Sequence, residues 1–210
     1  MIPLFHVSEK ITQEKMTIFN QNHPLFTQNG KNLSDFIRFE EKILQLAQTM
    51  RISLADYEID HLAIRVNQCK DAEDWLTALT KCGRILGDNI VNGRVIYLIE
   101  LDIPLFFANR EVNIIELPFP KKHDYPENTW EHIEVVIPFL PNESVAQWVN
   151  RIEDAFLWNN LNELTVKVSE PKVEGEQLPN PSIAVKLRNS SSNYTCIKVH
   201  PYNIKKVIEV

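Results

Sequence analysis

Two stretches decide the fold of this 210-residue chain, DHLAIRV at residues 60–66 and EHIEVVI at residues 131–137. Each consists of an acidic residue, a histidine and then alternating apolar residues, and the two histidines, His61 and His132, are 71 positions apart. Because side chains alternate between the two faces of a strand, each histidine shares its face with the residues two and four positions further on. We therefore expect the imidazoles of two repeated units to converge on one site.

The segments that follow each copy repeat one order of strand, helix and three strands. In the first half the pattern predicts a strand at 58–66, a helix at 71–82, and strands at 84–86, 95–101 and 112–117. In the second half it predicts a strand at 131–137, a helix at 144–158, and strands at 164–168, 183–187 and 195–200. Since neither four-stranded sheet can cover both of its faces, the two βαβββ modules are expected to pack side by side as one open, curved sheet with helices outside, an α+β fold.

The chain before the first module is predicted to be helical. Apolar residues recur at three- and four-residue spacing over residues 9–20 and 34–50, as they do on one face of a helix. Ser34 is the predicted N-cap of the second helix, and Asp35 in its first turn suits the positive end of the helix dipole. We expect one composite domain in three parts: an N-terminal helical extension at 1–55 packed on the core, a first module at 56–120 and a second at 128–205.

Several other residues are expected to have structural roles or none. The four tryptophans are predicted to pack between helices and sheet: Trp75, Trp130, Trp148 and Trp158. Three histidines fall in predicted loops and are expected at the surface: His6, His23 and His123. The three cysteines are odd in number and lack close metal-type spacing, so they are expected to be reduced thiols.

Composition excludes several classes of protein. A content of 44% hydrophobic and 24% charged residues is ordinary for a soluble globular protein. The net charge of −6 argues against a nucleic-acid partner, because that function usually depends on clustered Lys and Arg. No apolar run approaches the ~20 residues needed to cross a bilayer, and the first residues lack a signal-peptide pattern. We expect a cytoplasmic protein without a membrane partner.

Several short segments together resemble the YecM family of bacterial proteins: residues 60–65, 116–120, 130–136, 178–181 and 197–201. The duplicated modules with a histidine on each first strand are also similar to the vicinal oxygen chelate superfamily of metal-dependent enzymes. That superfamily includes glyoxalase I, methylmalonyl-CoA epimerase and the extradiol dioxygenases. The resemblance covers roughly residues 30–208 and implies a vicinal oxygen chelate fold that binds a divalent metal.

The resemblance also implies a set of metal ligands. The superfamily pattern expects a ligand on the first strand and one on the last strand of each module, which His61 and Glu116 match in the first half. His132 matches the first strand of the second half. Its last strand often carries Glu in the superfamily, whereas this chain offers Lys198 and His200. Since lysine must lose a proton before it can ligate and histidine need only be neutral, the resemblance favours His200.

The chemistry of such a set also follows from the residues themselves. Imidazole and carboxylate ligands suit Zn, Mn, Co, Ni or Fe as a divalent ion, rather than calcium. Such an ion can stabilise an enolate after a base removes a proton next to a carbonyl. Glu134, two residues after His132 on the same face, is the candidate catalytic base. Arg65 takes the matching place in the first module, where it could bind a substrate carboxylate through two hydrogen bonds.

Each of these assignments has a simpler competitor. Glu116 could be a buried carboxylate neutralised by Arg65 rather than by a metal. Glu134 could face solvent or pair with Lys198, and His200, which precedes a proline near a strand end, could lie at the surface. Asp60 and Glu131 alternate to the opposite face, although either could bond to an imidazole if its strand bulges.

Three functions are compatible with these residues. The first is a metal-dependent isomerase, epimerase or lyase acting on a small oxygenated acid or ketone. The second is an Fe(II) dioxygenase, which two histidines and one carboxylate permit. The third is a non-catalytic small-molecule-binding protein, because fold does not determine function. Since two modules in one chain can complete a cleft, we expect a monomer, with a dimer as the alternative.

Overall fold

Each half of the chain forms the same strand, helix and three strands. The computed structural model describes residues 19–91, 93–121, 124–170, 178–189, 191 and 193–208. The first module consists of β1 (Glu58–Arg65), α4 (Cys69–Thr80), β2 (Gly83–Val91), β3 (Arg94–Phe107) and β4 (Arg110–Pro118). The second consists of β5 (Thr129–Val136), α5 (Val145–Phe156), β6 (Leu164–Ser169), β7 (Ser182–Leu187) and β8 (Cys196–His200). The predicted duplication of a βαβββ unit is confirmed.

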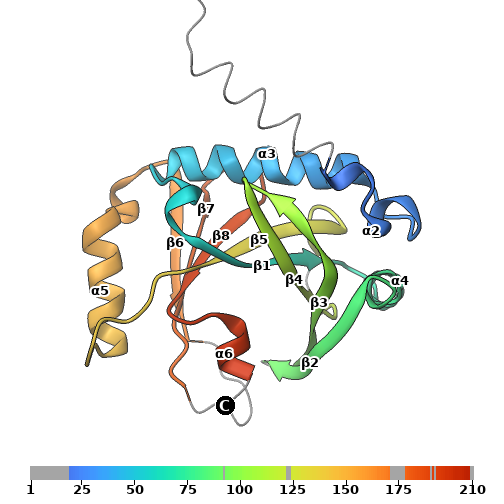
Figure 1. Ribbon diagram of the computed structural model, residues 1–210. Coiled ribbons are helices and arrows are strands. Elements are labelled where there is room, and N and C mark those ends of the chain that lie inside the picture. The colour runs from blue at the N-terminus through green and yellow to red at the C-terminus, as the bar shows by residue number, and fades with distance from the viewer. Residues whose placement is uncertain are drawn as a thin grey trace, which may run out of the picture.

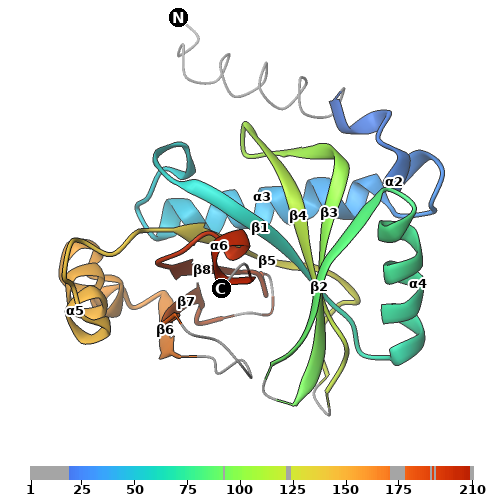
Figure 2. The same cartoon turned by 60° about the horizontal axis from the view of Figure 1, so that its bottom comes forward.

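The two modules share one mixed sheet. In each module the first strand pairs in parallel with the last, β1 with β4 and β5 with β8, and the other strands follow antiparallel. Antiparallel pairing of β1 with β5 joins the modules, which gives the strand order β2-β3-β4-β1-β5-β8-β7-β6 within the described residues. The sheet curves, and α4 and α5 lie outside its opposite ends (Figures 1 and 2). The expected open, curved sheet is confirmed.

The central pair of strands contains two register shifts that matter for the site. Ile59 and His61 pair with consecutive residues of β5, which leaves Asp60 as an extra residue in β1. On β5, Glu131 is extra in the same way, because its two neighbours pair with consecutive residues of β1. A bulge of this kind re-aims the side chain of the extra residue. The bulges are thus at equivalent positions, one immediately before each of the two repeated histidines.

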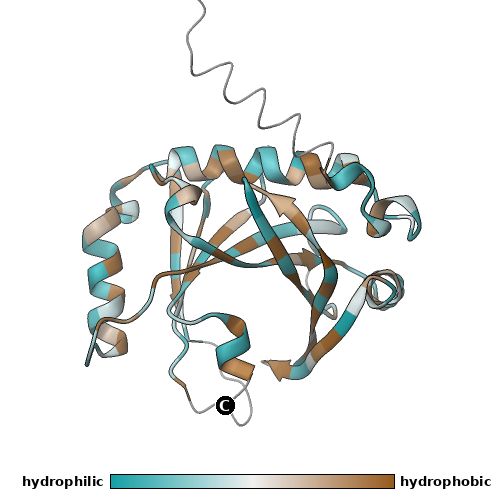
Figure 3. Ribbon diagram, viewed as in Figure 1, coloured by the Kyte–Doolittle hydropathy of each residue, from teal (hydrophilic) through white to brown (hydrophobic). Residues whose placement is uncertain are grey.

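The core lies on the outer face of the sheet, under α4, α5 and, across the middle of the sheet, α3 (Leu33–Thr49). This helix runs across the outside of the sheet, whereas the short α6 (Ile204–Ile208) lies in the opening on the other side (Figures 1 and 2). Phe36 and Phe39 of α3 contact the ring of Trp130 on β5. Apolar residues recur along α3 and the central strands (Figure 3). All four tryptophans are buried, so their predicted packing role is confirmed.

Two predictions for the first third of the chain are wrong. The N-cap of α3 is Asn32 rather than Ser34, because the Asn32 side chain accepts a hydrogen bond from the Ser34 backbone N–H at 2.9 Å. His23, expected at the surface, is 3% exposed. Its Nδ1 accepts from the Leu25 N–H and caps α2 (Pro24–Thr27), while its Nε2 bonds to the Ile103 carbonyl at 2.9 Å.

Other differences concern the lengths of elements. Strand β2 extends well beyond the predicted 84–86, because its pairing with β3 continues up to the turn at Gly93. Strand β3 extends beyond the predicted 95–101 as far as Phe107, because its last residues pair with β4. The short helices η1 (Leu54–Asp56) and η2 (Trp158–Asn160) complete the described elements. The helix predicted at 9–20 lies outside the described residues except for its last two positions. His6 and His123 also lie outside them. In the described part of the chain, no helix has the length and apolar character needed to span a bilayer.

Candidate metal centre

Four polar side chains from three adjacent central strands converge in the middle of the sheet. Ala63 of β1 pairs with Glu116 of β4 on one side and with His132 of β5 on the other. One step back along β1, His61 pairs with Glu134 of β5. Since these residues follow the two-residue alternation of their strands, their side chains share one face of the sheet. The predicted convergence of the two histidines and Glu116 is therefore present, and Glu134 joins them.

The separations within this group match those of ligands around one ion. His61 Nε2 is 3.7 Å from Glu116 Oε2 and 3.6 Å from Glu134 Oε1. His132 Nε2 is 3.8 Å from Glu116 Oε1 and 3.3 Å from Glu134 Oε1. Ligands bound at about 2.1 Å are separated by about 3.0 Å at adjacent octahedral positions and about 3.4 Å in a tetrahedron. One atom from each residue can be chosen so that all four lie within 4.8 Å of one another.

The two imidazoles each present one nitrogen without a hydrogen-bond partner among the described residues. His61 is 1% exposed and His132 is fully buried. In the described part of the chain neither Nε2 atom has a hydrogen-bond partner. Buried polar atoms almost always have such a partner, so two exceptions that face the same carboxylates call for an explanation. A bound cation would provide one, because a neutral imidazole offers a lone pair to a metal.

The other ring nitrogen of each imidazole bonds to the acidic residue that precedes it. His61 Nδ1 lies 2.9 Å from Asp60 Oδ2, and His132 Nδ1 lies 2.6 Å from Glu131 Oε2. A carboxylate at Nδ1 keeps the proton of a neutral imidazole on that nitrogen and leaves Nε2 as a lone-pair donor. The bulges at Asp60 and Glu131 make this contact possible. The alternative in which the acidic residues reach the imidazoles is thus confirmed for both.

Two cations hold the carboxylates of the group. Arg65 Nη1 donates to Glu116 Oε1 at 3.0 Å, and Arg65 Nε lies 3.5 Å from Glu131 Oε2. Lys198 Nζ donates to Glu134 Oε1 at 2.8 Å. Six charged side chains surround the two imidazoles: Asp60, Glu116, Glu131, Glu134, Arg65 and Lys198. When both imidazoles are neutral, as metal ligands must be, the formal charges leave an excess of two negative charges, which one divalent cation would balance.

The pKa values of the group reflect the same excess of negative charge. Burial lowers the pKa of His61, but the charge of Glu134 and the hydrogen bond to Asp60 raise it to well above its ordinary value. Burial raises the pKa values of Glu116 and Glu134, but the charges of Arg65 and Lys198 respectively hold them well below the usual range. The surroundings therefore favour the ionised forms of Glu116 and Glu134, and they favour an added positive charge at His61 Nε2.

Two apolar side chains also flank the site. Leu98 of β3 pairs with Glu116, and Cys196 of β8 pairs with His132, and both side chains are buried. Apolar walls exclude water and strengthen electrostatic interactions within the site. Burial raises the pKa of Cys196 to about 12, so its thiol stays protonated and is a poor metal ligand. All three cysteines are free, in agreement with the prediction.

Two predicted site residues lie beside the compact group. His200 is 1% exposed, so the surface alternative for it is wrong. Its Nε2 lies 3.3 Å from Asp60 Oδ2 and its Nδ1 3.5 Å from Glu134 Oε2, so it contacts partners of the group. Arg65, predicted to bind a substrate carboxylate, is engaged with carboxylates of the protein itself. Glu134 and Lys198 form the ion pair that the simpler interpretation of Glu134 anticipated.

Sequence reasoning did not assign Glu134 to the ligand group. The available signal was its position two residues after His132, which places both side chains on one face of β5. That signal does not separate a ligand from a base. Only the pairing of β1 with β5, which sets Glu134 opposite His61, brings its carboxylate within reach of both imidazoles.

Comparison with known proteins finds a matching family model and several relatives of this chain. A family model described as YecM protein matches residues 28–210. An uncharacterized protein of Haemophilus influenzae is 61% identical over 175 residues, covering 83% of this chain and 91% of that protein. Protein YecM of Escherichia coli is 35% identical over 175 residues, covering 83% and 89%. The solved structure of a protein named EC4020 has a TM-score of 0.69 at 33% identity, covering 84% of this chain and 88% of that one.

Proposed function

The chain belongs to the YecM family, and from the geometry of its central site we propose that it binds one divalent transition-metal ion: Zn, Mn, Co, Ni or Fe. The observation that carries the proposal is the pair of buried Nε2 atoms, on His61 and His132, that lack a hydrogen-bond partner in the described residues. Both face the carboxylates of Glu116 and Glu134 at separations that ligands of one ion adopt. The excess of two negative charges supports a divalent rather than a monovalent cation.

We propose His61, Glu116, His132 and Glu134 as the ligands. Glu134 thereby takes the fourth place, which the sequence resemblance assigned to His200. Its oxygen lies 3.3–3.6 Å from both imidazole nitrogens, and its depressed pKa keeps it ionised. His200 instead lies beside Asp60 and Glu134, with its ring nitrogens 3.3 Å and 3.5 Å from their carboxylate oxygens. A low pKa favours Glu134 as a ligand over a base, and its role as a base stays a prediction.

The surrounding residues would prepare the ligands for binding. Asp60 and Glu131 hold the imidazoles with Nε2 available and fix the ring orientations, as carboxylates bonded to metal-binding histidines generally do. Arg65 orients Glu116, and Lys198 orients Glu134. Lys198 is the more accessible of the two cations, with 24% of its side chain exposed against 7% for Arg65. It is therefore the cation better placed to contact a bound substrate.

Four protein ligands leave room for substrate oxygens on a five- or six-coordinate ion. When bound, such an ion would polarise a carbonyl oxygen and stabilise an enolate. We propose a small oxygenated acid or ketone as substrate, in an isomerase, epimerase or lyase reaction. The Fe(II) dioxygenase and the non-catalytic binding protein stay the alternatives. Iron content together with substrate-dependent oxygen uptake would favour the dioxygenase over the proposed reaction.

Metal titration tests the proposal directly. Calorimetric titration of Co²⁺, Ni²⁺ and Zn²⁺ into wild-type protein is expected to give one site with a Kd below about 1 μM. His61→Ala and Glu134→Gln are expected to abolish tight binding, and His200→Ala to weaken it less. Glu111→Gln, an exposed position on the same strand as Glu116, is the matched control and should bind like the wild type.

Two results would contradict the proposal. Wild-type protein that binds none of the three ions below micromolar concentration has no such metal site. Tight binding that survives His61→Ala places the ion elsewhere. Because the ligands are buried, circular dichroism and thermal unfolding of each variant are needed to show that loss of binding is not loss of fold.

A further inference from the structure

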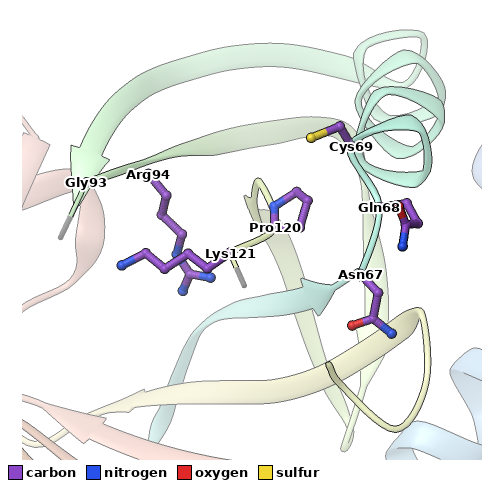
Figure 4. Close-up of a pocket in the computed structure, with 7 residues that line it drawn as sticks. All are labelled: Asn67, Gln68, Cys69, Gly93, Arg94, Pro120 and Lys121. Carbon is purple, nitrogen blue, oxygen red and sulfur yellow. The ribbon is translucent and has the colours of Figure 1, made fainter. Parts of the chain in front are cut away.

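A pocket of about 500 Å³ opens beyond the end of β1, near the tip of the β2–β3 hairpin (Figure 4). Seven residues line it: Asn67, Gln68, Cys69, Gly93, Arg94, Pro120 and Lys121. We call it the Arg94 pocket. Two of these residues are cations and none is acidic, although the chain as a whole carries a net charge of −6. The side chains of Arg94 and Lys121 extend into the same space (Figure 4).

The Arg94 pocket lies just past the ends of two strands of the metal cluster. Asn67 of the pocket lies two residues past Arg65, at which β1 ends. Pro120 of the pocket lies two residues past the end of β4 and four residues after Glu116, which limits their Cα separation to about 14 Å. The strand pairing of Ala63 with Glu116 keeps the two strands side by side.

Tyr125 connects the pocket with the metal cluster. Arg94 Nη1 lies 3.4 Å from the Tyr125 hydroxyl. The Asn67 side chain makes two hydrogen bonds with the backbone of Tyr125: it donates to the carbonyl at 2.9 Å and accepts from the N–H at 2.6 Å. Tyr125 also interacts electrostatically with Arg65, which binds Glu116. The pocket is therefore next to the residues that hold the metal ligands in place.

We propose that the Arg94 pocket binds the anionic end of a substrate whose other end chelates the metal, an inference that rests on the proposed function. The substrate class is a small acid with adjacent oxygens at one end and a carboxylate or phosphate at the other. The two ends of the substrate are separated by roughly 10 Å, within the limit set by the four residues from Glu116 to Pro120. The planar fork of Arg94 suits two parallel hydrogen bonds to such an anion, and Lys121 adds a second positive charge.

Inorganic phosphate is the probe for the pocket itself. Calorimetric titration into wild-type protein is expected to show binding, with Arg94→Ala and Lys121→Ala each weakening it about tenfold. Arg94→Lys should recover part of the affinity, because it keeps the charge and loses the fork. Lys167→Ala, an exposed lysine on β6, is the matched control. Wild-type protein without phosphate affinity, or pocket variants that bind phosphate like the wild type, would overturn the proposal.

The same titration separates this inference from the proposed function. His61→Ala should lose tight metal binding and keep its phosphate affinity, because His61 does not line the pocket. Arg94→Ala should keep its metal affinity. A wild-type protein that binds phosphate in the pocket and no metal would therefore refute the metal site, whereas one that binds metal and no phosphate would refute the pocket.

A probe that reaches both the metal and the Arg94 pocket is needed to test whether one substrate occupies both. For Co²⁺-loaded protein we expect 2-hydroxysebacate to bind about tenfold more tightly than 2-hydroxydecanoate, which has the same chain length and lacks the second carboxylate. Arg94→Ala should remove this difference. Equal affinities for the two acids in the wild type, or failure of both to bind while phosphate still occupies the pocket, would show that the pocket does not serve the metal-bound substrate.

Discussion

Replacement of Arg65 by methionine should lower the free energy of unfolding of metal-free protein by about 3–5 kcal/mol, the usual result of removing one partner of a buried ion pair. The Arg65 side chain is only 7% exposed. It lies 3.0 Å from Glu116 Oε1 and 3.5 Å from Glu131 Oε2. Methionine keeps much of the volume of the arginine stem, so the change is mainly one of charge.

The magnitude follows from these distances. At an effective dielectric constant of about 20, unit charges attract by roughly 5–6 kcal/mol at 3.0 Å and by roughly 5 kcal/mol at 3.5 Å. The cost of burying the guanidinium group offsets a large part of this attraction in the wild type. The variant no longer has the cost of burying the guanidinium group, but Glu116 and Glu131, whose side chains are 12% and 22% exposed, stay largely buried without their cation. The net loss is therefore several kcal/mol rather than the full sum of the two attractions.

Urea denaturation with and without a bound metal ion measures the effect. A metal ion supplies positive charge next to Glu116, so the loss caused by Arg65→Met should be smaller for metal-loaded protein. The double variant Arg65→Met/Glu131→Gln should recover part of the loss, because it removes one of the unpaired charges. Arg38→Met is the control, since Arg38 is 54% exposed in its ion pair with Asp35 and should lose less than about 1 kcal/mol. If Arg65→Met loses no more than Arg38→Met, the two carboxylates do not depend on Arg65.

Two further predictions concern a pH effect and a positioning residue. Burial raises the pKa of Glu40 to about 7 in the folded protein, despite its hydrogen bond from the Ala108 N–H. Because this pKa lies above the unfolded value, near 4.5, the contribution of Glu40 to stability is complete below pH 4.5 and is lost as the pH rises through about 7. The free energy of unfolding falls by about 3 kcal/mol over this range. The stability of Glu40→Gln relative to wild type should therefore rise by that amount between pH 4 and pH 8 in urea titrations, and a difference that does not change with pH would contradict the shift. Asp60→Asn should weaken Co²⁺ binding about 10–100-fold, because the asparagine no longer fixes the proton on His61 Nδ1. Unchanged affinity in calorimetry, matching the exposed control Asp56→Asn, would show that Asp60 does not position His61.

The repeated units and their order could be predicted from the sequence. The alternation of apolar residues after His61 and His132 is a local property, because side chains of a strand point to opposite faces whatever the strand pairs with. Each of the two modules has one sheet face that it cannot cover by itself, so the modules can pack together in only a few ways. The shared curved sheet and the meeting of both histidines with Glu116 followed from that pattern together with the family resemblance.

The composition of the site beyond those three residues depended on pairing between distant strands. Glu134 and His200 both lie on the correct face of their strands, and only the register of β1 against β5 sets Glu134 opposite His61. The bulges that turn Asp60 and Glu131 toward the imidazoles add a residue to one strand without changing its apolar pattern. Register and bulges are determined by contacts among residues far apart in the chain. A periodic pattern along one strand therefore determines which face a side chain occupies, but it does not determine which residues of the paired strands lie next to that side chain.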